Sequence, residues 1–196
     1  MTKRIIIGLI SIAAVSWIIF SDVEWGKYDS FEEVLEKGIP YKVKNVIHMQ
    51  NVDGVTVVMY TTEPDREGFP FADFDALAVA FLKGNDEDGW ENIGPNGWEH
   101  YENDNMTVYT KGVHSYDRRE NVRHEFYVVF GEINNSAITK IETKTKQEET
   151  FEPATIIMKE GKRYYFQVGP EDNVRGLSKD GKVIDQQGGE IMMKNR

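Results

Sequence analysis

Apolar positions along most of this chain recur at every second residue or gather in short runs bounded by Gly, Asn, Asp and Pro. This pattern is typical of β-strands. The Asp53-Gly54 pair is a hairpin turn signal between two such runs. The run at 77–82 also suits a turn of helix by composition, but it is short and ends at Gly84. Strands are expected at 41–49, 55–60, 77–82, 90–93, 98–101, 106–110, 125–133, 138–145, 154–159, 163–168, 176–178 and 182–184.

The strand spacing predicts a mainly β fold. Turn signals fall at intervals typical of sandwiches or barrels, and no long helical pattern competes with them. We therefore expect an antiparallel β-sandwich or two small stacked β subdomains. The alternation in Ile138 to Thr145 weakens toward its end, which predicts a strand at a sheet edge.

One short soluble helix is expected near residues 30–37. Ser30 and Glu33 have the spacing of a capping box, in which each side chain accepts a hydrogen bond from the other's backbone. Gly38 and Pro40 then stop the helix.

The N-terminal segment has the pattern of a signal peptide or a membrane anchor. Lys3 and Arg4 precede an uncharged run at 5–20, which spans about 24 Å as a helix. No small-x-small cleavage site follows, so a retained anchor is favoured over a removed signal that would release a secreted protein. A buried N-terminal helix is a third interpretation. The basic tip predicts a single-pass protein of the cell membrane whose bulk is extracytoplasmic.

These segments divide the chain into three regions. Residues 1–25 form the anchor and its flank, 26–118 an N-terminal β region with the short helix, and 119–196 a C-terminal β region. The division rests on the charged stretch Arg118 to Asn121, which has no strand pattern.

Charge and composition exclude several classes of function. The 196 residues include 33 acidic and 23 basic side chains, for a formal net charge of -10. Nucleic acid is not an expected partner, because its binders need a basic face. The absence of cysteine excludes disulfides, thiolate zinc sites and a cysteine nucleophile.

Two segments carry aromatic residues among polar ones and are the candidate binding sites. Trp90, Trp98 and Tyr101 lie among Gly, Asn and Glu, a composition that suits stacking on sugar rings; alternatively, the tryptophans close a core. The long connection from Thr61 to Asp75 carries Phe69, Phe71 and Phe74. These phenylalanines either form a partner-binding tip or fold back to cap the sheets.

Recognisable catalytic and metal motifs are missing from the sequence. His48, His100, His114 and His124 lack metal-ligand spacing, and the acidic turn at 85–89 fails the EF-hand pattern. No catalytic residue, metal or cofactor is therefore assigned. A glycosidase-type carboxylate pair stays open, with candidates Glu63, Asp73, Asp75, Glu91 and Glu99.

Several segments together resemble a known kind of protein. They are SFEEVLEKGIPY, DGVTVVMYT, WENIG, YVVFGEI, ITKIE and GLSKDGKVI, spread over nearly the whole chain. The chain resembles uncharacterised membrane-anchored proteins of Bacillus-type Gram-positive bacteria. The resemblance implies an extracytoplasmic location and no assigned activity.

Three hypotheses about function follow. The first is a non-enzymatic binding or accessory module at the cell surface, anchored in the membrane through residues 5–20, that takes a protein, peptide or glycan through the two aromatic segments. The alternative is a cell-wall hydrolase that uses a carboxylate pair. The third is an ectodomain that associates with itself through the edge at Ile138 to Thr145.

Overall fold

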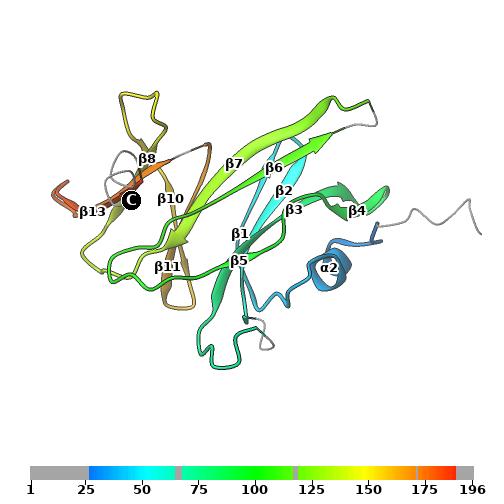
Figure 1. Ribbon diagram of the computed structural model, residues 1–196, viewed down its shortest axis with the longest axis horizontal. Coiled ribbons are helices and arrows are strands. Elements are labelled where there is room, and N and C mark those ends of the chain that lie inside the picture. Colours follow the sequence, from blue (N-terminus) through cyan, green and yellow to red (C-terminus); the bar gives the residue numbers. More distant parts are fainter. Residues whose placement is uncertain (1–26, 65–67, 117–118, 171, 189–196) are drawn as a thin grey trace, which may run out of the picture.

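The computed structural model describes residues 27–64, 68–116, 119–170 and 172–188 (Figure 1). Within these residues the chain forms thirteen strands, all in antiparallel pairs, and one short helical segment. The prediction of a mainly β, antiparallel protein with one short helix is confirmed. The N-terminal run at 5–20 lies outside the described residues. Within them, no helix has the length and apolar character needed to span a bilayer.

The strands form three sheets. The first sheet has the order β1-β2-β3-β4, with β5 also paired to β3. Its strands are β1 (Asn45–Val52), β2 (Val55–Thr62), β3 (Ala76–Asn85), β4 (Gly89–Asn92) and β5 (Trp98–Glu99). The run at 77–82 is therefore a strand.

The second sheet has the order β10-β11-β7-β6, and the third has the order β13-β12-β8-β9. The second contains β6 (Tyr109–Tyr116), β7 (Val122–Glu132), β10 (Thr155–Lys159) and β11 (Lys162–Val168). The third contains β8 (Lys140–Lys144), β9 (Glu152–Pro153), β12 (Asn173–Leu177) and β13 (Val183–Gly188). The predicted boundary at 118/119 falls between the paired strands β6 and β7, so the second sheet takes strands from both sides of it.

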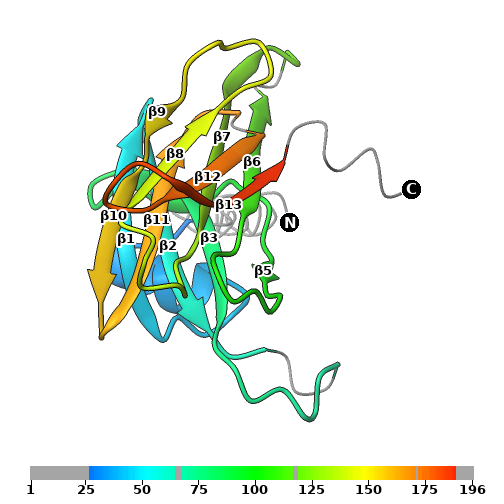
Figure 2. The same cartoon turned by 90° about the vertical axis from the view of Figure 1, so that its left-hand side faces the viewer.

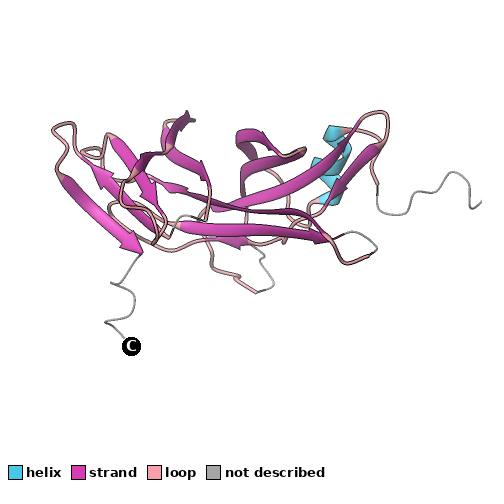
Figure 3. Ribbon diagram, turned by 90° about the horizontal axis from the view of Figure 1, so that it is seen from above, coloured by secondary structure: helices cyan, strands magenta, loops and turns pink. Residues whose placement is uncertain are grey.

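The helix and the three sheets stack as four layers, with the helix at one end of the molecule and the third sheet at the other (Figures 1 and 3). A first core lies between the first and second sheets and includes Val57, Phe81 and Phe130. A second core lies between the helix and the first sheet. A third core joins the second and third sheets.

Two of the sheets are buried on both faces, which explains their nearly continuous apolar strands. In β2, Val57 and Met59 face the first core while Val58 and Tyr60 face the second. In β7, Val128 and Phe130 face the first core and Val129 faces the third. Alternate side chains of a strand point to opposite faces, so a strand buried on both sides must be apolar throughout.

The helical segment consists of α2 (Phe31–Glu33) followed by one π-helical turn, η1 (Val34–Gly38). Ser30 Oγ accepts a hydrogen bond from the Glu33 backbone (3.1 Å), and Glu33 Oε2 accepts one from the Asp29 backbone (3.0 Å). This start resembles the predicted capping box, with the return bond one residue earlier.

The prediction that Ile138 to Thr145 is a sheet edge is wrong. Strand β8 pairs with β12 on one side and with β9 on the other, where Glu142 and Thr143 meet Pro153 and Glu152. The alternation of apolar and polar residues weakens because a polar residue, Thr143, takes a buried position. It is fully buried on the same face of the strand as Ile141.

Gly131 in β7 offers a test of the close packing within the second sheet. A β-carbon there would overlap the carbonyl oxygen of Thr107, which accepts a hydrogen bond from Tyr165 (2.8 Å). We predict that Gly131→Ala lowers the free energy of unfolding by about 1–3 kcal/mol, because overpacking displaces the neighbouring backbone. Urea denaturation would measure this change.

Gly97→Ala is the matched control, because the nearest heavy atom to its added β-carbon is Lys111 Nζ at 3.5 Å. It should leave the free energy of unfolding within about 0.5 kcal/mol of the wild-type value. Equal losses in the two variants would show that the contact at Gly131 has no special role.

Candidate functional site

The two predicted tryptophans lie at separate places on the first sheet. Trp90 in β4 pairs with Gly84 of β3, and Trp98 in β5 pairs with Ala78. These partners are six residues apart on one strand, a separation of about 20 Å. Both indoles are half-buried and pack against the second core. They do not form one binding surface together.

Trp90 joins the start of the described chain to the first sheet. Its backbone exchanges two hydrogen bonds with Tyr28 (2.7 and 2.8 Å). Its ring meets that of Phe31 edge-on at 5.1 Å, and its Nε1 donates to Asp86 (2.7 Å). These contacts hold the helical segment in place.

Trp98 belongs to an aromatic cluster at the base of the connection between β2 and β3. The rings of Phe69 and Phe74 lie 5.1 and 6.3 Å from that of Trp98, and Phe74 also stacks on His100 at 3.5 Å. The connection projects from the end of the first sheet (Figure 2, bottom). Two of its three phenylalanines therefore fold back against the protein.

Phe71 is the exception and points into solvent. It lies in a turn that is closed by a hydrogen bond from the Ala72 backbone to the Phe69 carbonyl (3.1 Å). Pro70 occupies the second position of this turn, where its fixed φ is favoured. Phe71 is 95% exposed and Phe69 is 51% exposed.

The base of this connection lines a pocket of about 820 Å³ at one end of the first and second sheets. Strands β2 and β7 end at this site, and β1, β3, β6 and β11 begin there. Its walls combine strand ends with the 99–104 segment. The lining residues are Lys44, Glu63, Pro64, Ala72, Asp73, Phe74, Asp75, Leu77, Glu99, His100, Tyr101, Glu102, Asn103, Asp104, Thr107, Tyr109, Glu132, Asn134 and Lys162.

The pocket is strongly acidic. Seven of its lining residues carry a carboxylate and two are lysines. Lys44 Nζ lies 2.6 Å from Asp75 and 3.6 Å from Glu63, and Lys162 Nζ lies 3.0 Å from Glu132. Lys111, which is not one of the lining residues, pairs with Glu99.

Three pocket carboxylates make no ion pair within the described part of the chain: Asp73, Glu102 and Asp104. All three belong to the two segments that flank the pocket, 72–75 and 99–104. The fold therefore leaves a local excess of negative charge there.

Four of the five carboxylates predicted from the sequence line this pocket, and Glu91 does not. The prediction missed Glu102, Asp104 and Glu132. The acidic run at 99–104 carries a signal for the first two. Glu132 reaches the pocket only through the pairing of β7 with β11, which the sequence does not specify.

Tyr101 forms part of the wall, and its hydroxyl is engaged on both sides. It accepts a hydrogen bond from the Val108 backbone (2.5 Å) and donates one to Gln187 (2.7 Å). Tyr109 Oη accepts a hydrogen bond from the Tyr101 backbone (3.1 Å). Burial is the main cause of the raised pKa of both phenols. This network joins the pocket wall to β13.

The negative charge of the pocket reaches Tyr164 in the first core. The pKa of Tyr164 is raised to about 12, chiefly by burial and also by the carboxylates of Glu132 and Asp75. No group of three or more His, Asp or Glu residues within the described ranges is arranged to hold a metal ion.

Comparisons of the chain with known proteins found no relative. No protein-family model matches the chain, and searches of curated proteins and of solved structures found no significant match. The function is therefore inferred from the geometry of the site.

We predict that alkaline pH weakens the fold through its buried tyrosines. An unfolded tyrosine loses its proton near pH 10. Because Tyr164 is held neutral up to about pH 12, its stabilising contribution is complete below pH 10 and is lost as the pH rises toward 12. The free energy of unfolding in urea should fall between pH 9 and pH 11.5, and Tyr164→Phe should reduce that fall.

Tyr116→Phe is the control, since Tyr116 is 60% exposed at the other end of β6. It should keep the wild-type dependence on pH. A Tyr164→Phe variant with the wild-type dependence would contradict the role given to the buried phenol.

Proposed function

We propose that this protein is a non-enzymatic binding module that holds a positively charged ligand in its acidic pocket. The observation that carries the proposal is a set of three carboxylates at one concavity of about 820 Å³, Asp73, Glu102 and Asp104, that make no ion pair with any residue the structure describes. A cationic group placed among them would neutralise charge that the fold leaves uncompensated.

The size of the pocket supports a small ligand or a short segment of a larger one. Pockets that take small molecules have volumes of about 300–1,000 Å³. Two aromatic rings also contribute to the pocket wall, since Phe74 and His100 stack on each other and both line it. Such surface suits the aliphatic stem of a lysine or arginine side chain.

The charge of the whole chain supports the same ligand class. A net charge of -10 attracts cations over a long range, and a concave acidic site concentrates that attraction. Among the expected partners at a cell surface, basic peptide segments and amino sugars have the required charge.

The extracytoplasmic location is part of the proposal. It rests on the basic tip and the apolar run at 5–20, and on the resemblance of the chain to membrane-anchored proteins. A membrane anchor of this kind would present the pocket to ligands outside the cell.

Neutralising two of these carboxylates provides the main test. We predict that Asp73→Asn combined with Glu102→Gln weakens binding of a fluorescent tetralysine peptide about tenfold at low salt, because two attractive charges are lost from the site. Fluorescence anisotropy on the full chain would measure the dissociation constant, and added salt should weaken wild-type binding.

Glu149→Gln combined with Glu152→Gln is the matched control. It makes the same change in net charge at exposed positions outside the pocket. It should alter the dissociation constant by less than about twofold. Equal weakening in both double variants would show that the net charge of the protein, and not the pocket, determines the affinity. A wild-type protein that binds no tetralysine would overturn the proposal.

A hydrolase that uses a carboxylate pair is the second candidate. The observation in its favour is that Lys44 Nζ contacts both Asp75 and Glu63, which brings these two carboxylates together at the pocket. A glycosidase uses its two carboxyl groups on either side of the scissile bond. Here Lys44 contacts both carboxylates, so the arrangement favours ligand binding over acid catalysis.

The hydrolase candidate makes a separate prediction. Glu63→Gln and Asp75→Asn should each lower the release of reducing ends from purified cell-wall glycan by at least about 100-fold. Glu91→Gln, outside the pocket, should leave that rate unchanged. No release by the wild-type chain would exclude this candidate.

A further inference from the structure

An exposed turn with two partly or fully exposed phenylalanines lies beside the pocket. Phe71 is 95% exposed and Phe69 is 51% exposed, although both lie on a connection whose next residues, Ala72 to Asp75, line the acidic pocket. Single exposed apolar side chains are common on protein surfaces. Phe69 and Phe71 flank Pro70 on a turn next to the acidic pocket, and both expose apolar surface to solvent.

The turn is held in place before any partner arrives. Its hydrogen bond from Ala72 to Phe69 and the ring of Pro70 restrict its backbone. Phe69 packs edge-on against Trp98, which fastens the turn to β5. A contact made by Phe71 would therefore cost little ordering of the loop, which is the physical benefit of preorganisation.

The spacing between the apolar and acidic groups is short. Phe71 and Asp73 are two residues apart, so their Cα atoms lie within about 7 Å of each other. An extended peptide advances about 3.3 Å per residue. A basic side chain near Asp73 and an apolar side chain on Phe71 would then belong to residues within about two positions of each other in the partner.

We propose that the partner is an extended peptide segment in which a bulky apolar residue lies within two positions of a lysine or arginine, the apolar side chain packing on Phe71 and the basic one entering the pocket. This inference rests on the proposed function. An amino-sugar polymer has the charge but lacks an apolar side chain to match Phe71, so a peptide fits the turn better.

Two peptides of equal charge test the inference. Acetylated Gly-Lys-Leu-Lys-Gly and acetylated Gly-Lys-Asn-Lys-Gly differ only at the central residue, which has similar size but opposite polarity. The wild-type full chain should bind the leucine peptide about fivefold more tightly, as expected for partial burial of one apolar side chain. Isothermal titration calorimetry would give both dissociation constants.

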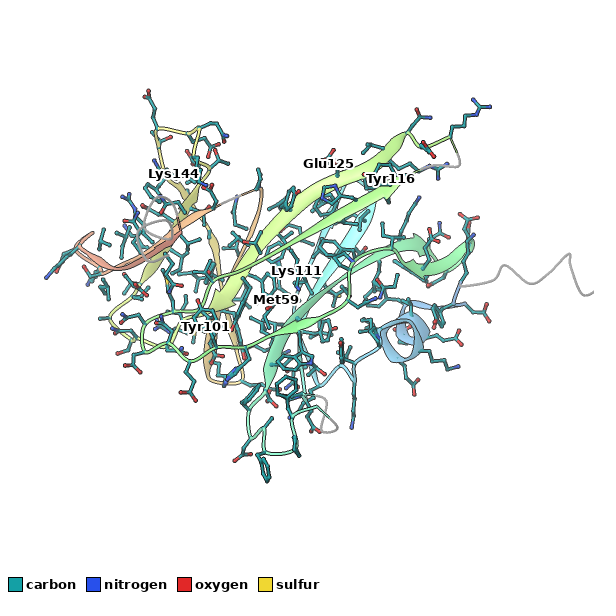
Figure 4. All side chains as sticks on the ribbon, viewed as in Figure 1. Met59, Tyr101, Lys111, Tyr116, Glu125 and Lys144 are labelled. Atoms are coloured by element: carbon teal, nitrogen blue, oxygen red, sulfur yellow. The ribbon has the colours of Figure 1, made fainter. Side chains whose placement is uncertain are left out.

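Variants of the turn then locate the effect. Phe71→Ser should remove the preference for leucine, so that the leucine and asparagine peptides bind with equal affinity. Phe71→Leu should restore most of the preference. Tyr116→Ser is the control, because Tyr116 is also an exposed aromatic residue but lies at the far end of β6 from the pocket, well away from Tyr101 (Figure 4). It should keep the wild-type preference.

The outcomes separate this inference from the function on which it rests. Equal binding of the two peptides, or a leucine preference that survives in Phe71→Ser, would overturn the peptide inference and leave the proposal of a cation-binding acidic pocket intact. Tighter binding of a chitosan oligomer than of either peptide would also overturn it. Failure of both peptides to bind to a protein that binds tetralysine would overturn the inference alone, whereas failure to bind tetralysine as well would overturn the proposed function too.

Discussion

Burial of both faces of two adjacent sheets is the constraint on which the rest of this structure depends. The first sheet presents Val58 and Tyr60 to one side and Val57 and Met59 to the other, and the second sheet divides its apolar residues in the same way. Each fully buried side chain of this size contributes about 1.5–3 kcal/mol. Left uncovered, each sheet would expose an apolar face to water, and the helix covers one side of the stack while the third sheet covers the other.

The acidic pocket follows from this stack. Strands that are apolar on both faces leave room for charged groups only at their ends, where water can reach them. Because neighbouring strands are antiparallel, Lys44, Glu63, Asp75, Glu132 and Lys162 come from different parts of the chain yet meet at one end of two sheets. The same layers that exclude charge from the core therefore concentrate it at the pocket.

Local signals predicted local structure well. The helix start at Ser30 and the hairpin turn at Asp53-Gly54, where both residues have positive φ, are where the sequence places them. Pairing between distant segments was not predictable, because apolar runs do not specify their partners. Trp90 and Trp98 are close in sequence but separate in space, since β4 and β5 pair with different parts of β3. Most of the site's candidate carboxylates were found from the sequence, but the pocket that unites them was not.

The lysines of the pocket determine which of its carboxylates keep an uncompensated negative charge. Exposed ion pairs contribute only about 0–1 kcal/mol to stability, so Lys44 and Lys162 matter more for the local field than for the fold. Where a lysine already neutralises a carboxylate, an added ammonium group would gain little attraction. It would gain more beside Asp73, Glu102 and Asp104, which make no ion pair within the described residues. Asp73 is two residues from Phe71, so an unpaired carboxylate among the described residues lies close in the chain to the most exposed apolar side chain of the turn.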